Sequence, residues 1–218
     1  MIETAAIIKR TADHIAQLLS GEHTGHDWWH VYRVWQNALH IGKQEHVDMF
    51  VVELAALLHD VADWKFHGGD ETAGSRSARE WLMSQSVGGG VVDHVCQIID
   101  DLSFKGAGVR TSMKTREGMV VQDADRLDAL GAIGIARAFA YGGHKGQEIY
   151  NPDISPTHHT SFEQYKNSTG TTINHFHEKL LLLKDLMNTQ TGRAIAARRH
   201  EYLVEFLERF HLEWEGKA

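Results

Sequence analysis

Hydrophobic residues recur at the helical period of about 3.6 along almost the whole chain, and this periodicity most narrows what the chain can fold into. No stretch of useful length alternates with the two-residue period of a β-strand. The segment Phe50–Val61 is nearly all apolar, so we expect it to form a buried central helix. The pattern predicts an all-α fold, a helical bundle that extends over residues 1–218 as a single domain.

Other helices are predicted wherever an apolar face repeats, around Ile7–Leu19, Trp28–Ile41, Gly74–Ser84, Val91–Leu102, Met119–Tyr141, Asn174–Met187 and Gly192–Trp214. Residues 142–169 are instead rich in Gly, His, Ser, Thr and Asn. A connection of that length is usually functional, so we expect a functional loop whose histidines could line a lid; the sequence does not assign its role.

Charge and hydropathy exclude several classes of protein. The chain has 22 basic and 29 acidic side chains, a net charge of −7, and this acidic balance argues against a protein that binds duplex nucleic acid. No apolar run approaches the roughly 20 residues that span a bilayer, so we expect no membrane partner. The start of the sequence has no basic region followed by a long apolar core, which favours a cytoplasmic protein.

Acidic residues and a histidine stand inside the most apolar segments. His59 and Asp60 close the apolar segment that starts at Phe50, where a bare carboxylate would be strongly penalised. A second apolar segment holds Asp123, Asp125 and Asp128. Buried charges are generally paired or bound to a metal; Arg126 can neutralise one carboxylate, and a cation is the natural partner for another. Each string alone also fits an ordinary core residue or helix cap, but together they favour a metal site.

Four strings in this order resemble the HD-domain superfamily of metal-dependent phosphohydrolases, which is named for its His…His-Asp…Asp ligand set. They are HDWWHVYRV, LAALLHDVAD, DADRLDALGAIGIARAF and INHFHEKLLLLKDLMNT, and they look like the small stand-alone bacterial members of that superfamily. The resemblance covers nearly the whole chain. It implies a motif core at about residues 26–137, and C-terminal helices at 171–214 that pack on the site and close it.

The resemblance implies that four residues bind a divalent metal ion, namely His30, His59, Asp60 and Asp125. Asp123 is a rival for the last position. We prefer Asp125 because the last aspartate of the family typically follows a small residue and precedes a short polar–apolar pair. Two imidazoles and two carboxylates suit Mn²⁺, Mg²⁺, Ni²⁺, Fe²⁺ or Zn²⁺ without choosing among them.

Metal-assisted hydrolysis of a phosphoester follows from this ligand set. Asp63 matches the position where some family members place an acidic residue that transfers protons, although it also fits a surface carboxylate paired with Lys65. Arg33 and Lys65 are expected to assist catalysis beside the phosphate. Arg137, Lys179 and His175 are further candidates for contacts with the substrate phosphate, while solvated helix faces explain Arg137 and Lys179 equally well.

Several other residues are candidates for orienting a ligand or for holding a second metal. His26 and Asp27 precede His30 by about one helical turn and can orient its imidazole. Because some family members bind additional metals through extra histidines, His67 and His94 are candidates too, although a solvent-facing role suits His94 as well. Asp123 and Asp128 complete this group.

Three functions compete for this sequence. The first is an enzyme that cleaves a small phosphorylated substrate, expected to be a nucleotide, whether a mono-, tri- or cyclic phosphoester. The second is a non-catalytic HD module that senses a nucleotide, and missing ligands would be its signature. The third is a helical protein whose metal is structural, which chelation would unfold. No ligand of the set is missing, so we favour the enzyme; the oligomeric state stays open.

Overall fold

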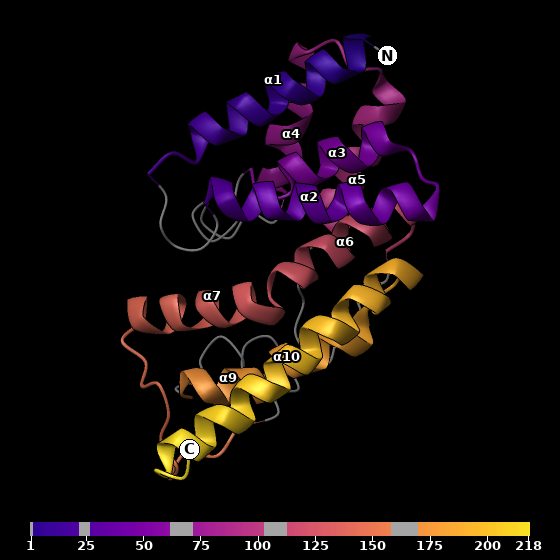
Figure 1. Cartoon of the computed structure of the whole chain (residues 1–218). Helices are drawn as coiled ribbons and strands as arrows, with labels where there is room; N and C mark the ends of the chain where they lie inside the picture. Colours follow the sequence, from indigo (N-terminus) through magenta and orange to yellow (C-terminus); the bar gives the residue numbers. More distant parts are fainter. Residues whose placement is uncertain (1, 22–26, 62–71, 103–112, 158–169) are drawn as a thin grey trace. The chain divides into compact units, whose positions relative to one another are not determined.

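The computed structural model describes residues 2–21, 27–61, 72–102, 113–157 and 170–218 (Figure 1). These residues form helices and connecting turns without any strand, which confirms the all-α fold. No helix among them is long and apolar enough to cross a membrane. The chain divides into two compact units, of which the first includes Met1–Phe104 and Thr111–Asp125, and the second includes Arg126–Ala218. The single domain expected over residues 1–218 stays a prediction.

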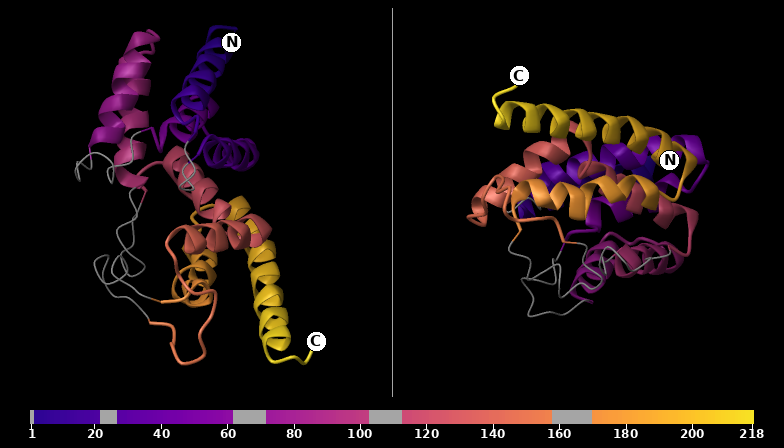
Figure 2. Two further views of the ribbon diagram at one scale, coloured as in Figure 1. Left: turned by 90° about the vertical axis from the view of Figure 1, so that its left-hand side faces the viewer. Right: turned by 90° about the horizontal axis from the view of Figure 1, so that it is seen from below.

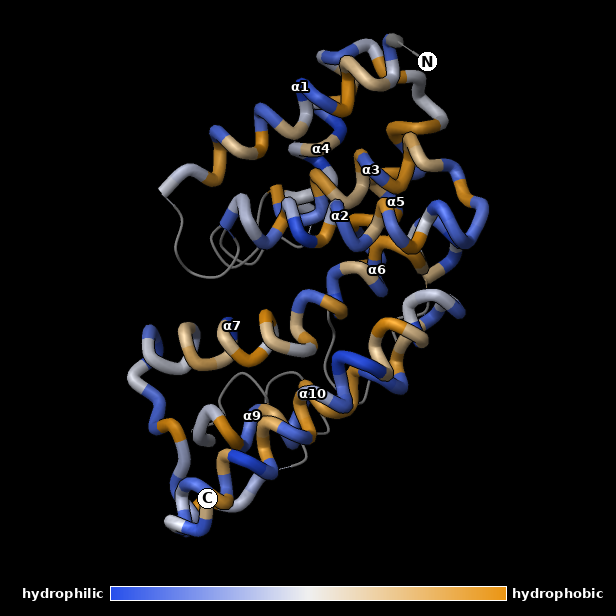
Figure 3. The backbone as a smooth tube through the Cα atoms, viewed as in Figure 1, coloured by the Kyte–Doolittle hydropathy of each residue, from blue (hydrophilic) through white to orange (hydrophobic). Residues whose placement is uncertain are grey.

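The first unit is built around a buried helix, as the sequence predicts. It contains α1 (Ile2–Leu18), α2 (Trp28–Glu45), α3 (Met49–Leu58), α4 (Ala73–Ser84), α5 (Gly89–Leu102) and most of α6 (Arg116–Asp128). Helix α3 packs against α1, α2 and α5, and α4 packs against α5. Every residue of α3 from Leu54 to Leu58 is 0% exposed. Figure 3 shows the same helix coloured as hydrophobic over most of its length.

The ends of α2 and α3 are fixed by local chemistry. Asp27 caps α2, and Asp48 caps α3 by accepting from the backbone N–H groups of Phe50 and Val51. Only three residues connect the two helices, and His46 among them adopts a left-handed conformation with φ 54°. Two packed helices joined by so short a turn run antiparallel. The start of α2 therefore lies beside the end of α3.

The second unit packs α7 (Gly131–His144) against α9 (Thr172–Glu178) and α10 (Gln190–Trp214), which lie side by side in Figures 1 and 2. The 3₁₀ helix η2 (Leu180–Leu186) contacts α9 and α10. Three aromatic rings meet at the centre of this packing. The ring centroid of Phe176 is 5.9 Å from that of Phe139 and 5.7 Å from that of Phe206.

Two predicted helices are each divided in the structure. The segment Met119–Tyr141 forms α6 and α7, because the chain turns at Gly131 with φ 72°. The segment Asn174–Met187 forms α9 and η2, because Lys179 leaves the helical region with φ −140° and ψ −58°. The predicted loop at 142–169 begins later than expected, since α7 continues to His144, and its residues 158–169 lie outside the described residues.

Candidate metal centre

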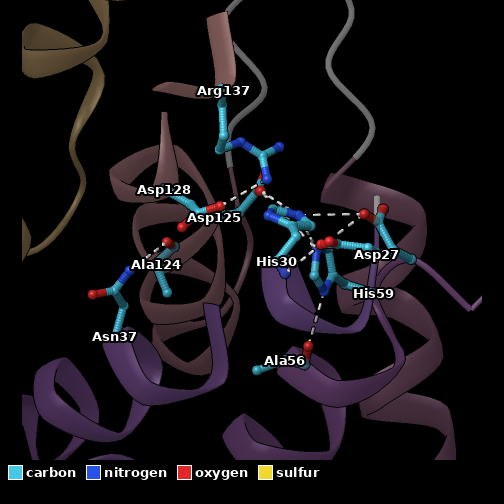
Figure 4. Close-up of polar contacts among 10 residues, drawn as sticks. Asp27, His30, Asn37, Ala56, His59, Ala124, Asp125, Asp128 and Arg137 are labelled. Atoms are coloured by element: carbon cyan, nitrogen blue, oxygen red, sulfur yellow. Dashed lines mark hydrogen bonds and ion pairs between the residues drawn. The ribbon is translucent and has the colours of Figure 1, made fainter. Parts of the chain in front are cut away.

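The antiparallel pairing of α2 and α3 brings two histidines together at one end of the first unit. His30 lies in the first turn of α2 and is 2% exposed, and His59 directly follows α3. Their Nε2 atoms are 3.3 Å apart. Figure 4 shows the two labelled side chains close together. Two ring nitrogens at this separation face the same small volume.

Two carboxylates approach the same pair of nitrogens. Asp60 Oδ2 lies 3.3 Å from His30 Nε2 and 3.5 Å from His59 Nε2. Asp125 on α6 places Oδ1 at 3.5 Å from His30 Nε2 and 4.0 Å from His59 Nε2. Ligands about 2.1 Å from one metal ion are separated by about 3.0–3.4 Å from their neighbours, so the donor spacing fits a single cation. We refer to His30, His59, Asp60 and Asp125 as the donor cluster.

Within the described part of the chain, His30, His59 and Asp60 form a group whose ligand atoms all lie within 4.8 Å of one another and could hold a metal ion. Asp125 joins this group through its contacts with the two imidazoles. Its side chain is 41% exposed, compared with 3% for His30 and 5% for His59. The cluster therefore has a buried side made of imidazoles and an open side at Asp125.

A backbone carbonyl orients the ring of His59, and a helix cap holds the backbone of His30. His59 Nδ1 lies 2.8 Å from the carbonyl oxygen of Ala56, which can only accept, so Nδ1 carries the proton and Nε2 of the neutral ring is free to bind a metal. Asp27 Oδ1 accepts from the backbone N–H of His30 at 2.9 Å. Asp27 thus fixes the start of the helix from which the His30 ring extends.

Asn37 is a site residue that the sequence reasoning missed. Its Nδ2 donates to the carbonyl oxygen of Ala124 at 3.3 Å and so joins α2 to α6 directly before Asp125. Asn37 lies seven residues after His30, which places the two side chains on one face of α2. The signal in the sequence was a polar residue, Asn37, on the face of α2 that packs against other helices.

The remaining candidates in the first unit lie in different surroundings. Asp123 is 0% exposed within α6, and Arg33 is half-buried on α2. His94 on α5 places Nε2 at 3.0 Å from Thr115 Oγ1 and 3.8 Å from Glu117 Oε2, and neither residue belongs to the donor cluster. Four candidates lie outside the described residues: His26, Asp63, Lys65 and His67.

The second unit contains the other predicted phosphate contacts. Arg137 Nη1 pairs at 3.0 Å with Asp128, which is 1% exposed. Burial, aided by the nearby charge of Lys179, lowers the pKa of His175 to about 3. His175 is therefore neutral at neutral pH, and any contact it makes with a phosphate is a hydrogen bond rather than an ion pair. Lys179 follows the last residue of α9 and is half-buried.

An all-helical unit that presents two histidines and two aspartates in the order His…His-Asp…Asp has the fold and the residue order of an HD domain. The family model described as "HD domain" matches residues 28–130, which include the whole donor cluster. The chain belongs to the HD-domain superfamily.

Three comparisons extend over almost the full length of the chain. The protein YpgQ of Bacillus subtilis (strain 168) is 38% identical over 203 residues, which cover 93% of this chain and 91% of YpgQ. The crystal structure of an HD-superfamily hydrolase from Bacillus thuringiensis superposes with a TM-score of 0.77 and 42% identity, over 97% of this chain and 98% of that one. A crystal structure of YpgQ in complex with ADP has the same TM-score at 34% identity, over 97% and 96% of the two chains.

Proposed function

We propose that the protein is a phosphohydrolase that depends on a divalent metal and cleaves a phosphoester of a nucleotide or a related small molecule. The donor cluster carries this proposal, because side chains from the start of α2, the end of α3 and α6 converge on one point. The carboxylates of Asp60 and Asp125 both lie within 4.0 Å of both buried imidazoles. The relatives support the substrate class: one is described as an HD-superfamily hydrolase, and another was crystallised with ADP.

In this proposal His30, His59, Asp60 and Asp125 hold the metal. A bound divalent cation polarises a phosphoryl oxygen and lowers the pKa of a water molecule. The protein's own contribution is to orient the donors. The carbonyl of Ala56 holds the His59 ring with Nε2 toward the cluster, and the two aspartates supply the negative charge that a dication requires. The mixed nitrogen and oxygen donors suit Mn²⁺, Mg²⁺, Ni²⁺, Fe²⁺ or Zn²⁺.

Further residues are proposed for the substrate. Arg33 lies about one turn after His30 on α2, at a position from which a guanidinium can reach a phosphate beside the cluster. We propose Asp63 for proton transfer and Lys65 for charge neutralisation on the basis of the family resemblance. On the basis of the sequence, Lys179 and Arg137 are proposed as further phosphate contacts, with the neutral His175 as a hydrogen-bonding partner.

A metal-resolved substrate screen tests this function. Protein stripped of metal is incubated with each of the five cations in turn and with a panel of nucleotides, and the products are separated by chromatography. We expect hydrolysis in the wild type with at least one metal, and a loss of at least about 100-fold in His59→Ala, since a metal ligand is removed. The matched control is His40→Ala, which removes an exposed histidine elsewhere on α2.

Two outcomes contradict the proposal. If the wild type forms no more product than His59→Ala with any of the metals, the protein does not hydrolyse the nucleotides tested. If a nucleotide raises the melting temperature but is recovered intact, the protein is a sensing module instead.

A further inference from the structure

The first residues of α6 form hydrogen bonds to the short turn between α2 and α3. Arg116 Nη2 donates to the carbonyl oxygen of Glu45, the last residue of α2, at 2.8 Å. Glu117 Oε1 accepts from the backbone N–H of Asp48, the residue that caps α3, at 3.0 Å. Two neighbouring residues of one helix thus hold both ends of the turn that joins two others.

Helix α5 contributes to the same junction. Thr115 precedes α6 and caps it, since Thr115 Oγ1 accepts from the backbone N–H of Gly118 at 3.1 Å. His94 on α5 approaches Thr115 Oγ1 at 3.0 Å and the Glu117 carboxylate at 3.8 Å. Glu117 is only 17% exposed and lies in the first turn of α6, where the helix dipole favours its charge. We call Thr115, Arg116 and Glu117 the turn clamp.

The turn clamp and the donor cluster lie at opposite ends of the same helices. His30 is about 22 Å from the clamped end of α2 along the helix axis, and His59 is about 15 Å from the clamped start of α3. Asp125 is about 12 Å along α6 from Glu117. At a rise of 1.5 Å per residue, a tilt of about 5° at the clamp displaces Asp125 by about 1 Å. Metal sites tolerate far less, since ligand distances vary by only about 0.2 Å.

We propose that Glu117 and Arg116 are positioning residues of the metal centre, which set the angles of α2, α3 and α6 and thereby the spacing of the donors. This inference rests on the proposed metal-binding function. It also gives His94 a role: the histidine that the sequence suggested for a second metal supports the Glu117 side of the clamp.

The experiment measures metal binding directly, without any substrate. Mn²⁺ is titrated calorimetrically into the metal-free full chain, and each variant is first checked by circular dichroism. We expect Glu117→Ala to weaken Mn²⁺ affinity by about twofold to thirtyfold, the range for a coupling transmitted through packed elements. Glu117→Gln should recover most of the affinity, because its amide oxygen can still accept from the N–H of Asp48. Arg116→Ala, at an exposed position, should show a smaller loss in the same direction.

Two controls separate positioning from a general loss of stability. Leu82→Ala removes a fully buried side chain from α4, a helix without donors, and should lower the melting temperature while leaving Mn²⁺ affinity unchanged. Lys114→Ala removes an exposed charge that pairs with Asp101 beside the clamp and should change neither.

The outcomes distinguish the two proposals. Wild-type affinity in folded Glu117→Ala overturns the inference, as does an equal loss in Leu82→Ala or a failure of Glu117→Gln to recover binding. If Glu117→Ala does not fold, wild-type affinity in Arg116→Ala overturns it instead. A wild-type protein that binds none of the five cations of the substrate screen contradicts the proposed function itself, and the inference falls with it.

Discussion

Two aspartates of α6 occupy opposite environments although only one residue separates them. Asp125 is 41% exposed and faces His30, whereas Asp123 is fully buried. Side chains two positions apart on a helix point about 200° apart, so only one of the two can face a given site. We predict that Asp125→Asn weakens Mn²⁺ affinity by at least about 100-fold while the metal-free protein keeps its melting temperature. Asp123→Asn should instead keep Mn²⁺ affinity within about twofold of the wild type. It should lower the free energy of unfolding by about 1–3 kcal/mol.

Calorimetric titration and thermal unfolding in a chelator measure both quantities on the same two variants, and each variant serves as the control for the other. Equal losses of affinity would show that the distances around Asp125 do not reflect a ligand. A larger loss in Asp123→Asn would make Asp123 the fourth ligand, the alternative that the sequence left open.

At the scale of single residues, the sequence could indicate the ligand types but not what holds them. His59 and Asp60 stand out because polar residues rarely end so apolar a segment. The partner of His59 is a backbone carbonyl, which every residue has, so no side-chain pattern marks Ala56. Arg116 and Glu117 likewise read as ordinary charged residues at a helix start, because their partners come from the distant turn after α2.

At the scale of elements, the division between α6 and α7 depends on one backbone conformation. Gly131 has φ 72°, and a Cβ there would meet Arg199 Cγ at 3.2 Å. Arg199 in turn donates to the carbonyl oxygen of Leu127 at 2.5 Å, close to the end of α6. We predict that Gly131→Ala destabilises the protein by about 1–2 kcal/mol, because alanine disfavours the left-handed conformation. Any displacement of Arg199 by the new Cβ would add to this loss. Urea unfolding followed by circular dichroism measures the change.

Gly143 is the matched control for this prediction. It lies in α7, and nothing comes within 4 Å of a Cβ built on it. Alanine has a higher helix propensity than glycine, so Gly143→Ala should be neutral or should stabilise by up to about 1 kcal/mol. A Gly131→Ala variant as stable as Gly143→Ala would mean that the turn between α6 and α7 does not require a glycine.

Helix existence was more predictable than helix ends, for a physical reason. Apolar periodicity reports which face of a segment is buried, and it correctly indicated α1 to α5 and α10. The break at Gly131 is not marked in that pattern, because the buried Leu127 and Leu130 continue it up to the turn. The same applies at Lys179, where buried Phe176 and Leu180 continue the apolar pattern from α9 into η2.

At the scale of the whole molecule, the core and the donor cluster are separate sources of stability. The first unit buries α3 against α1, α2 and α5 through apolar side chains, and the donors lie at helix ends or on the open side of α6. We therefore predict that chelation leaves the helical circular dichroism signal at 25 °C unchanged. Mn²⁺ at about 100 times its dissociation constant should then stabilise the protein by about 2.7 kcal/mol, since it binds only the folded state.

For a chain of this size, that free energy corresponds to a rise of about 5–11 °C in melting temperature, and His59→Ala should show none of it. Because every donor belongs to the first unit, hydrogen exchange should slow in α2 and α3 on metal binding and stay unchanged in α10. Loss of the helical signal on chelation would instead identify a structural metal. Protection that extends equally into α10 would show that the metal stabilises both units together, so the exchange pattern separates a local site from a metal on which the whole fold depends.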